Sequence, residues 1–256
     1  MVQKRTIGLI GFVAVFFLLG VSGYGQDMPS GGLVRLVNCS LNEGTTMAEA
    51  VNWARNAPRD DTDASLIFFR QAIFTGAFQA SSDFTIASYY PSYGEMVSRV
   101  GARGALPQNR VRPGRRASDL FTCDPSSARL NRSRIVNPDS DGFSGEGTLM
   151  SSRLCRLNEG ASVADAYAFA QGIARNFAAG GDNSLMQVVT REHGPVGERV
   201  AGRGVALLTV PATPEGFASR RDLQAGGLRA LQGLTLPMAC DYPAMWFTHA
   251  VHRAGN

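Results

Sequence analysis

The chain has 256 residues, of which 44% are hydrophobic and 18% charged, and its formal net charge is +4. This composition excludes an intrinsically disordered protein, which would carry fewer apolar residues and more charge. So small an excess of basic residues does not indicate a nucleic-acid-binding protein, and we expect no specific binding to nucleic acid.

The N-terminal segment, residues 1–25, has the layout of a secretory signal peptide. Lys4 and Arg5 precede an apolar run over 7–19, and small residues follow it, which places cleavage before Gln26. The run is shorter than the ~20 residues that span a bilayer, although an uncleaved anchor remains the alternative. No later stretch is apolar for long enough to span. We therefore expect a soluble periplasmic or secreted protein.

The remaining chain contains an internal repeat. Residues 39–50, CSLNEGTTMAEA, match residues 155–166, CRLNEGASVADA, at seven of twelve positions, with an offset of 116. A second landmark, Thr122-Cys123-Asp124 against Ala239-Cys240-Asp241, keeps an offset of 117. The repeat predicts three parts after the signal peptide, with the bounds 26–136 for the first copy, 137–148 for a polar linker and 149–256 for the second copy.

Each copy has the same predicted order of strands and helices. Apolar stretches with partial alternation predict strands, and a hydroxyl followed three residues later by an acid, as in Thr46/Glu49 and Ser162/Asp165, predicts each first helix. The expected order is β-α-β-β-α-β, an α+β unit of the ferredoxin-like type. The expected strands are 33–41, 66–75, 84–90, 128–136, 185–192, 205–211 and 245–252, with the second helices at 91–100 and 214–231.

Two such units in one chain resemble a fused form of the dimeric α/β-barrel superfamily, which includes antibiotic-biosynthesis monooxygenases and NIPSNAP-like proteins. The opening C-x-L-x-x-G-x-[ST]-x-x-[DE], present at Cys39 and again at Cys155, also resembles a group of exported bacterial proteins. The resemblance implies two ferredoxin-like sheets packed against each other as a pseudo-dimeric barrel. These motifs specify strand ends, caps and turns and carry no reaction.

Four cysteines in an exported chain favour disulfides, and three pairings are possible. In the ferredoxin-like strand order the first and last strands are antiparallel neighbours. That order brings the end of the first strand close to the start of the last, so we predict Cys39–Cys123 and Cys155–Cys240. A zinc or redox site is the alternative, but the chain has no CxxC and three histidines only.

Candidate reactive residues are few. Alternation along the last strand places His249 on one face and Trp246 and His252 on the other, which argues against a shared metal. We expect no metal and no cofactor in the leading interpretation. If the barrel were a cofactor-free monooxygenase or a haem-handling enzyme, as the resemblance allows, its site would lie inside the barrel. The residues to test would then be His249, Trp246, Trp53 and Tyr89.

A cluster of arginines without acids is the main charge feature. It falls between the second helix and the last strand of the first copy. Such a segment is either an exposed, solvated loop or a site for an anionic envelope surface such as phospholipid. The residues predicted to bind the anion are Arg103, Arg110, Arg112, Arg115 and Arg116.

The sequence therefore contains no recurring reactive constellation. Our leading hypothesis is an envelope protein that is non-catalytic or binds a small apolar molecule. The enzyme hypothesis and the anionic-surface hypothesis are retained as alternatives.

Overall fold

The computed structural model describes residues 28–58, 63–75, 82–105, 115–195 and 202–254. The predicted signal peptide lies outside the described residues. None of the helices within these ranges has the length and apolar character that crossing a bilayer requires.

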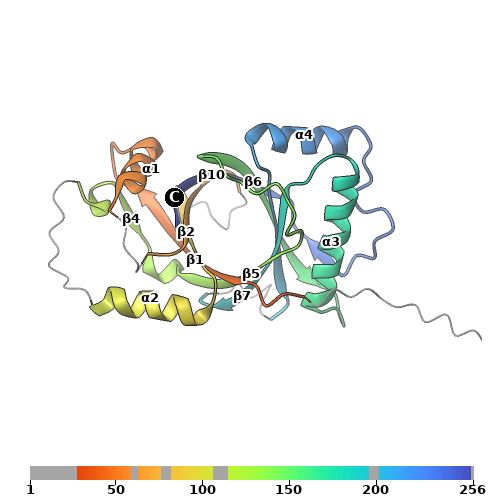
Figure 1. Cartoon of the computed structure of the whole chain (residues 1–256), viewed down its shortest axis with the longest axis horizontal. Helices are drawn as coiled ribbons and strands as arrows, with labels where there is room; N and C mark the ends of the chain where they lie inside the picture. Colours follow the sequence, from red (N-terminus) through yellow and green to blue (C-terminus); the bar gives the residue numbers. More distant parts are fainter. Residues whose placement is uncertain (1–27, 59–62, 76–81, 106–114, 196–201, 255–256) are drawn as a thin grey trace, which may run out of the picture.

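The described first half contains four strands and two α-helices in the predicted order, and one additional short strand, β4, before the last (Figure 1). Two 3₁₀ turns flank β4. The elements are β1 (Gly32–Leu41), α1 (Met47–Asn56), β2 (Leu66–Phe74), β3 (Phe84–Tyr90), α2 (Tyr93–Ala105), β4 (Phe121–Cys123) and β5 (Arg129–Ile135).

The second half repeats this order, again with a short extra strand, β9, before the last. The first strand, β6, begins two residues inside the segment predicted as linker. The elements are β6 (Gly147–Leu157), α3 (Val163–Ala179), β7 (Leu185–His193), β8 (Gly204–Val210), α4 (Pro214–Ala225), β9 (Met238–Cys240) and β10 (Ala244–Arg253).

The two predicted capping boxes are confirmed. The Thr46 side chain accepts a hydrogen bond from the Glu49 amide while the Glu49 carboxylate accepts one from the Thr46 amide, and Ser162 and Asp165 form the same pair. Each box satisfies amides that a helix leaves free in its first turn. The repeated LNEG segment is thus a strand-to-helix turn.

Two helix bounds differ from the sequence prediction. Helix α2 begins at Tyr93, where the Ser92 hydroxyl accepts from the Glu95 amide, and it continues to Ala105. Helix α4 stops at Ala225 and does not reach residue 231. The Gly226 amide bonds back to Asp222, and Gly227 has a φ of 97°, which is the left-handed conformation that glycine adopts easily.

Eight long strands form one closed antiparallel barrel, which Figure 1 shows nearly end-on. Within each half the order is that of a ferredoxin-like sheet: β2-β3-β1-β5 and β7-β8-β6-β10. The halves then join edge to edge, because β5 pairs with β7 and β10 pairs with β2. The fold is therefore α+β, with two tandem ferredoxin-like halves that close a pseudo-dimeric α/β barrel by shared strand pairing.

The helices cover the outside of the barrel, and apolar clusters lie beneath them. Helix α1 covers a cluster that includes Phe69, Phe84 and Phe121, and α3 covers one that includes Val188 and Val205. Both predicted disulfides are present, Cys39–Cys123 and Cys155–Cys240. Each joins a first strand to the short extra strand beside it, β4 or β9, and this short strand escaped sequence prediction.

Candidate functional site: the inner face of the barrel

The pairing register identifies which side chains face the barrel interior. Directly paired residues in antiparallel strands project from the same face of the sheet, and neighbours along one strand alternate. Trp246 pairs with Ala72 and with Met150, and these three belong to an apolar cluster separate from those beneath the helices. This cluster therefore marks the inner face.

The inner face is apolar on one side. The buried members of the cluster come mainly from the second half, and Phe143, from the connection between the halves, joins them. Phe143 lies 6.1 Å from the ring of Phe68 on β2, and Arg253 stacks on both rings at 4.9 and 5.6 Å. The cluster consists of Phe143, Met150, Val189, Leu208, Val210 and Trp246.

The other side of the inner face is polar and cationic. Arg70 pairs with Thr85 and Thr248, which places all three inside. On β5, Leu130 packs in an apolar cluster with Met96 of α2, so its neighbours Arg129 and Asn131 point to the inner face. On the next strand, Arg191 pairs with Asn131. Arg70, Arg129 and Arg191 thus project inward from β2, β5 and β7.

These three arginines have no carboxylate partner among the described residues. Arg70 donates to the Tyr89 hydroxyl, Arg129 to Asn38 Oδ1 at 2.8 Å, and Arg191 to the Pro195 carbonyl at 2.8 Å. The described inner positions of the eight strands hold neither aspartate nor glutamate. The positive charge of this side is therefore not neutralised by the described part of the chain.

The charges are close enough to affect one another. Burial lowers the pKa of Arg129 to about 10, and the neighbouring Arg191 and Arg70 contribute to the same shift. Burial also lowers the pKa of Arg191. A group with a pKa near 10 is still protonated at neutral pH, so the barrel holds at least three positive charges together.

Many polar atoms on this face lack a partner. Seven buried side-chain nitrogen or oxygen atoms of the described residues make no hydrogen bond, and all but the Arg134 atom belong to the inner face. Their residues are 7% exposed or less except for Arg191, which is partly buried. The six inner atoms are Arg70 Nε, Asn131 Nδ2, Ser133 Oγ, Gln187 Oε1, Arg191 Nε and Thr248 Oγ1.

A surface hollow of about 220 Å³ lies at the end of β1 beside the first disulfide. Asn38, whose amide oxygen accepts from Arg129, lines this hollow together with Cys123 and Asp124. Arg129 thus sits directly behind one wall of the hollow. A larger hollow, about 560 Å³, lies beside α4 on the outside and contains none of the predicted site residues.

The four candidate catalytic residues do not come together. Trp246 and Tyr89 face inward: Trp246 Nε1 donates to Ser152 Oγ at 2.9 Å, and the Tyr89 ring meets Phe68 edge to face at 5.8 Å. Trp53 belongs to α1, outside the barrel, where Nε1 donates to the Arg115 carbonyl at 2.7 Å.

His249 does not line the interior, where the enzyme hypothesis would need it to lie. It pairs with Phe69, a member of the cluster under α1, so it faces outward. Its Nε2 lies 3.3 Å from Gln71 Oε1, and its ring lies 4.7 Å from that of Phe247. Burial and the nearby Arg55 lower its pKa. Among the described residues, no group of histidine, cysteine and acidic side chains could hold a metal.

The arginines of the predicted anionic-surface site are only partly described. Arg110 and Arg112 lie outside the described residues, and Arg103 is in α2. Arg115 pairs with Glu49 at 3.2 Å, and the Arg116 amide donates to Asp119. Binding to an anionic surface stays a prediction.

The inner arginines were missed as a group by sequence reasoning. Arg70 carried a signal, because it interrupts the apolar strand LIFFRQAIF. Nothing in the sequence linked it to Arg129 or Arg191, which lie about 60 and 120 residues further along.

No protein-family model matches the chain, and no curated protein matches it. Solved structures with a similar backbone arrangement include a proposed monooxygenase from Fusobacterium nucleatum. It is 9% identical, the match covers 88% of this chain and 94% of the other, and the TM-score is 0.46. An anthrone oxidase-like protein has 10% identity, coverage of 91% and 98%, and a TM-score of 0.42. An encapsulated DyP-type peroxidase from Mycobacterium smegmatis has 12% identity, coverage of 87% and 94%, and a TM-score of 0.38.

Proposed function

We propose that the protein binds a small molecule inside its barrel and works outside the cytoplasm as a binding protein. The observation that carries this proposal is the set of six polar atoms on the inner face that have no partner in the described chain.

Unpartnered polar atoms are costly. A buried donor or acceptor that makes no hydrogen bond costs about 1–3 kcal/mol, and folded proteins leave few of them. Six on one face of one barrel would remove a large part of the stability of a typical domain. A bound polar molecule that supplies partners, alone or with ordered water, would offset this cost.

The apolar side of the barrel supports the same proposal. Trp246 and its neighbours offer an apolar surface that adjoins the polar one, and ligand sites commonly combine an apolar lining with a few polar groups. The two disulfides fit a location in an oxidising compartment.

Trp246 provides a reporter for binding. The chain has two tryptophans, and Trp53 lies outside the barrel. In Trp53→Phe protein, all tryptophan fluorescence comes from the interior. We expect a small aromatic probe from the set benzamide, indole, benzoate, benzenesulfonate and phenyl phosphate to change this fluorescence saturably and to raise the melting temperature.

The matched control is Trp246→Phe, which keeps Trp53 alone. It should lose the fluorescence change and keep the rise in melting temperature. If no probe changes either signal in Trp53→Phe protein, the interior holds water only and the proposal fails.

A further inference from the structure

We propose that the ligand of the barrel is an organic oxyanion, whose charged head binds Arg70, Arg129 and Arg191 and whose apolar body lies against Trp246. This inference rests on the proposed function and specifies the chemical class of the molecule.

The first argument is charge. Three guanidinium groups project from three strands into the interior, near enough that Arg70 and Arg191 influence Arg129, and the described inner positions offer no carboxylate. Buried charges in proteins are ordinarily paired, because removing an ion from water costs several kcal/mol. An anion held among these groups would supply the missing pairing.

The second argument is hydrogen-bonding capacity. Arg70 and Arg191 each leave Nε buried without an acceptor, and Asn131 Nδ2 on β5 is also buried without an acceptor. All three are donors, and the hydroxyl of Ser133 can donate as well. A guanidinium presents Nε and one terminal nitrogen side by side, which matches two oxygens of a carboxylate, sulfonate or phosphate. The excess of free donors favours an acceptor-rich, negatively charged head.

The third argument is the division of the inner face. Arg70 lies between Phe68 and Ala72 along β2, and both of these residues pack against the apolar cluster. The cationic and apolar sides therefore meet on one strand. A molecule with an anionic head and an apolar body would contact both sides at once, whereas inorganic phosphate would leave the apolar side uncovered.

The experiment uses full-length mature Trp53→Phe protein at constant ionic strength. Benzoate, benzenesulfonate and phenyl phosphate share a ring and differ in the oxyanion, so their relative affinities distinguish a carboxylate from a sulfonate or phosphate head. Benzamide has nearly the shape of benzoate without its charge. We expect at least one anion to bind at least tenfold more tightly than benzamide.

Arg191→Met tests the assigned residue. It should weaken binding of the preferred anion at least tenfold and leave benzamide binding unchanged, because it removes one charged donor. Arg35→Met is the matched control: it makes the same change at an exposed arginine on the outer face of β1, and it should alter neither affinity.

The outcomes separate the two proposals. If benzamide or indole binds as tightly as every anion, or if Arg191→Met leaves anion affinity unchanged, the oxyanion inference is wrong while binding inside the barrel stands. If no probe of either kind binds, the proposed function fails and the inference fails with it.

Discussion

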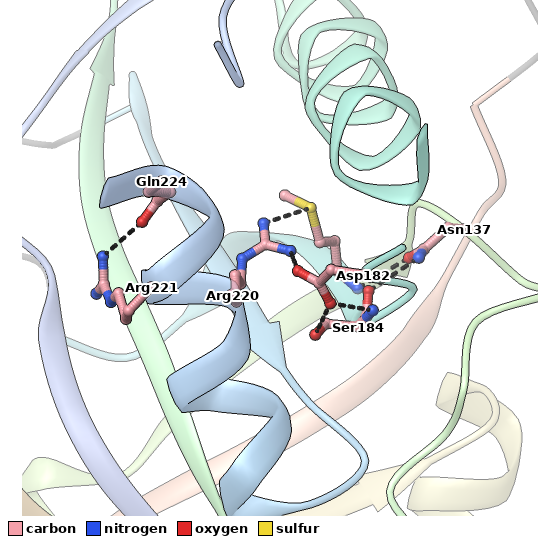
Figure 2. Close-up of polar contacts among 7 residues, drawn as sticks. Asn137, Asp182, Ser184, Arg220, Arg221 and Gln224 are labelled. Carbon is pink, nitrogen blue, oxygen red and sulfur yellow. Dashed lines mark hydrogen bonds and ion pairs between the residues drawn. The ribbon is translucent and has the colours of Figure 1, made fainter. Parts of the chain in front are cut away.

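Arg220 and the three inner arginines of this protein have opposite surroundings. Arg220 on α4 lies outside the barrel, where it forms an ion pair with Asp182 and contacts the sulfur of Met186 (Figure 2). Its guanidinium also stacks on Phe177 at 3.4 Å. Arg70, Arg129 and Arg191 face the interior with no described acid. One arginine serves the fold, and the other three serve a ligand in our proposal.

Figure 2 shows how completely the outer arginine is paired. Asp182 also accepts from the amide and hydroxyl of Ser184, and Asn137 anchors the same turn through the Ser184 carbonyl and the Met186 amide. Both charged side chains are 10% exposed or less. The contrast indicates that this chain pairs a buried arginine where stability alone is required.

The largest expected effect comes from breaking the outer pair. Asp182→Ala leaves Arg220 as an unpaired buried charge, and we expect the free energy of unfolding to fall by about 3–5 kcal/mol. Urea denaturation of the oxidised protein measures this. Asp139→Ala, at an exposed acid in the same region, should change it by less than about 0.5 kcal/mol. Equal losses of stability in Asp182→Ala and Asp139→Ala would show that the Arg220–Asp182 pair does not stabilise the fold.

A smaller effect, of opposite sign, is expected inside the barrel. Arg191→Met removes a charge that has no described counter-ion, so the unfolding free energy of ligand-free protein should stay the same or rise by about 1–2 kcal/mol. The control is Arg132→Met on the outer face, because Arg132 is paired with Glu192 at 2.7 Å and its loss should destabilise. A loss of stability in Arg191→Met as large as in Arg132→Met would contradict the comparison.

The smallest effect concerns His249, a partly buried basic group near Arg55. Its pKa is lowered in the folded protein, so below the unfolded value of about 6.5 the unfolded chain binds more protons than the folded one. Stability is therefore complete above that pH and falls as the pH drops through the window down to the folded pKa. The unfolding free energy at pH 7.5 and 5.5 measures this loss, which His249→Asn should reduce. An unchanged pH dependence in His249→Asn would assign the loss to other groups.

The architecture was predictable because its signals are local and occur twice. The LNEG turns with their capping boxes, the alternating strand 84–90 and the paired cysteines each depend on neighbours in sequence or on strand order within one half. The edge-to-edge closure was harder to predict from the sequence, because the β5–β7 and β10–β2 pairings join separate halves and have no local signal.

The candidate site was predictable only in part. Alternation separated Trp246 from His249, but it could not show which of the two faces of the last strand was the inner one. The arginines of the proposed ligand site come from three strands, and no sequence pattern connects one of them with the other two. Only closure of the barrel brings Arg70, Arg129 and Arg191 together.

The disulfides have a consequence for how the two halves are held together. Cys39–Cys123 and Cys155–Cys240 each close a loop within one half, with sequence separations of 84 and 85, and neither crosses the boundary at residues 137–146. A single peptide-bond cut in that connection would leave two fragments, each covalently cross-linked within itself and joined to the other only by non-covalent contacts, among them the β5–β7 and β10–β2 strand pairing. The protein is therefore suited to be expressed as two complementing fragments, whose reassociation would rebuild the interior from both pieces.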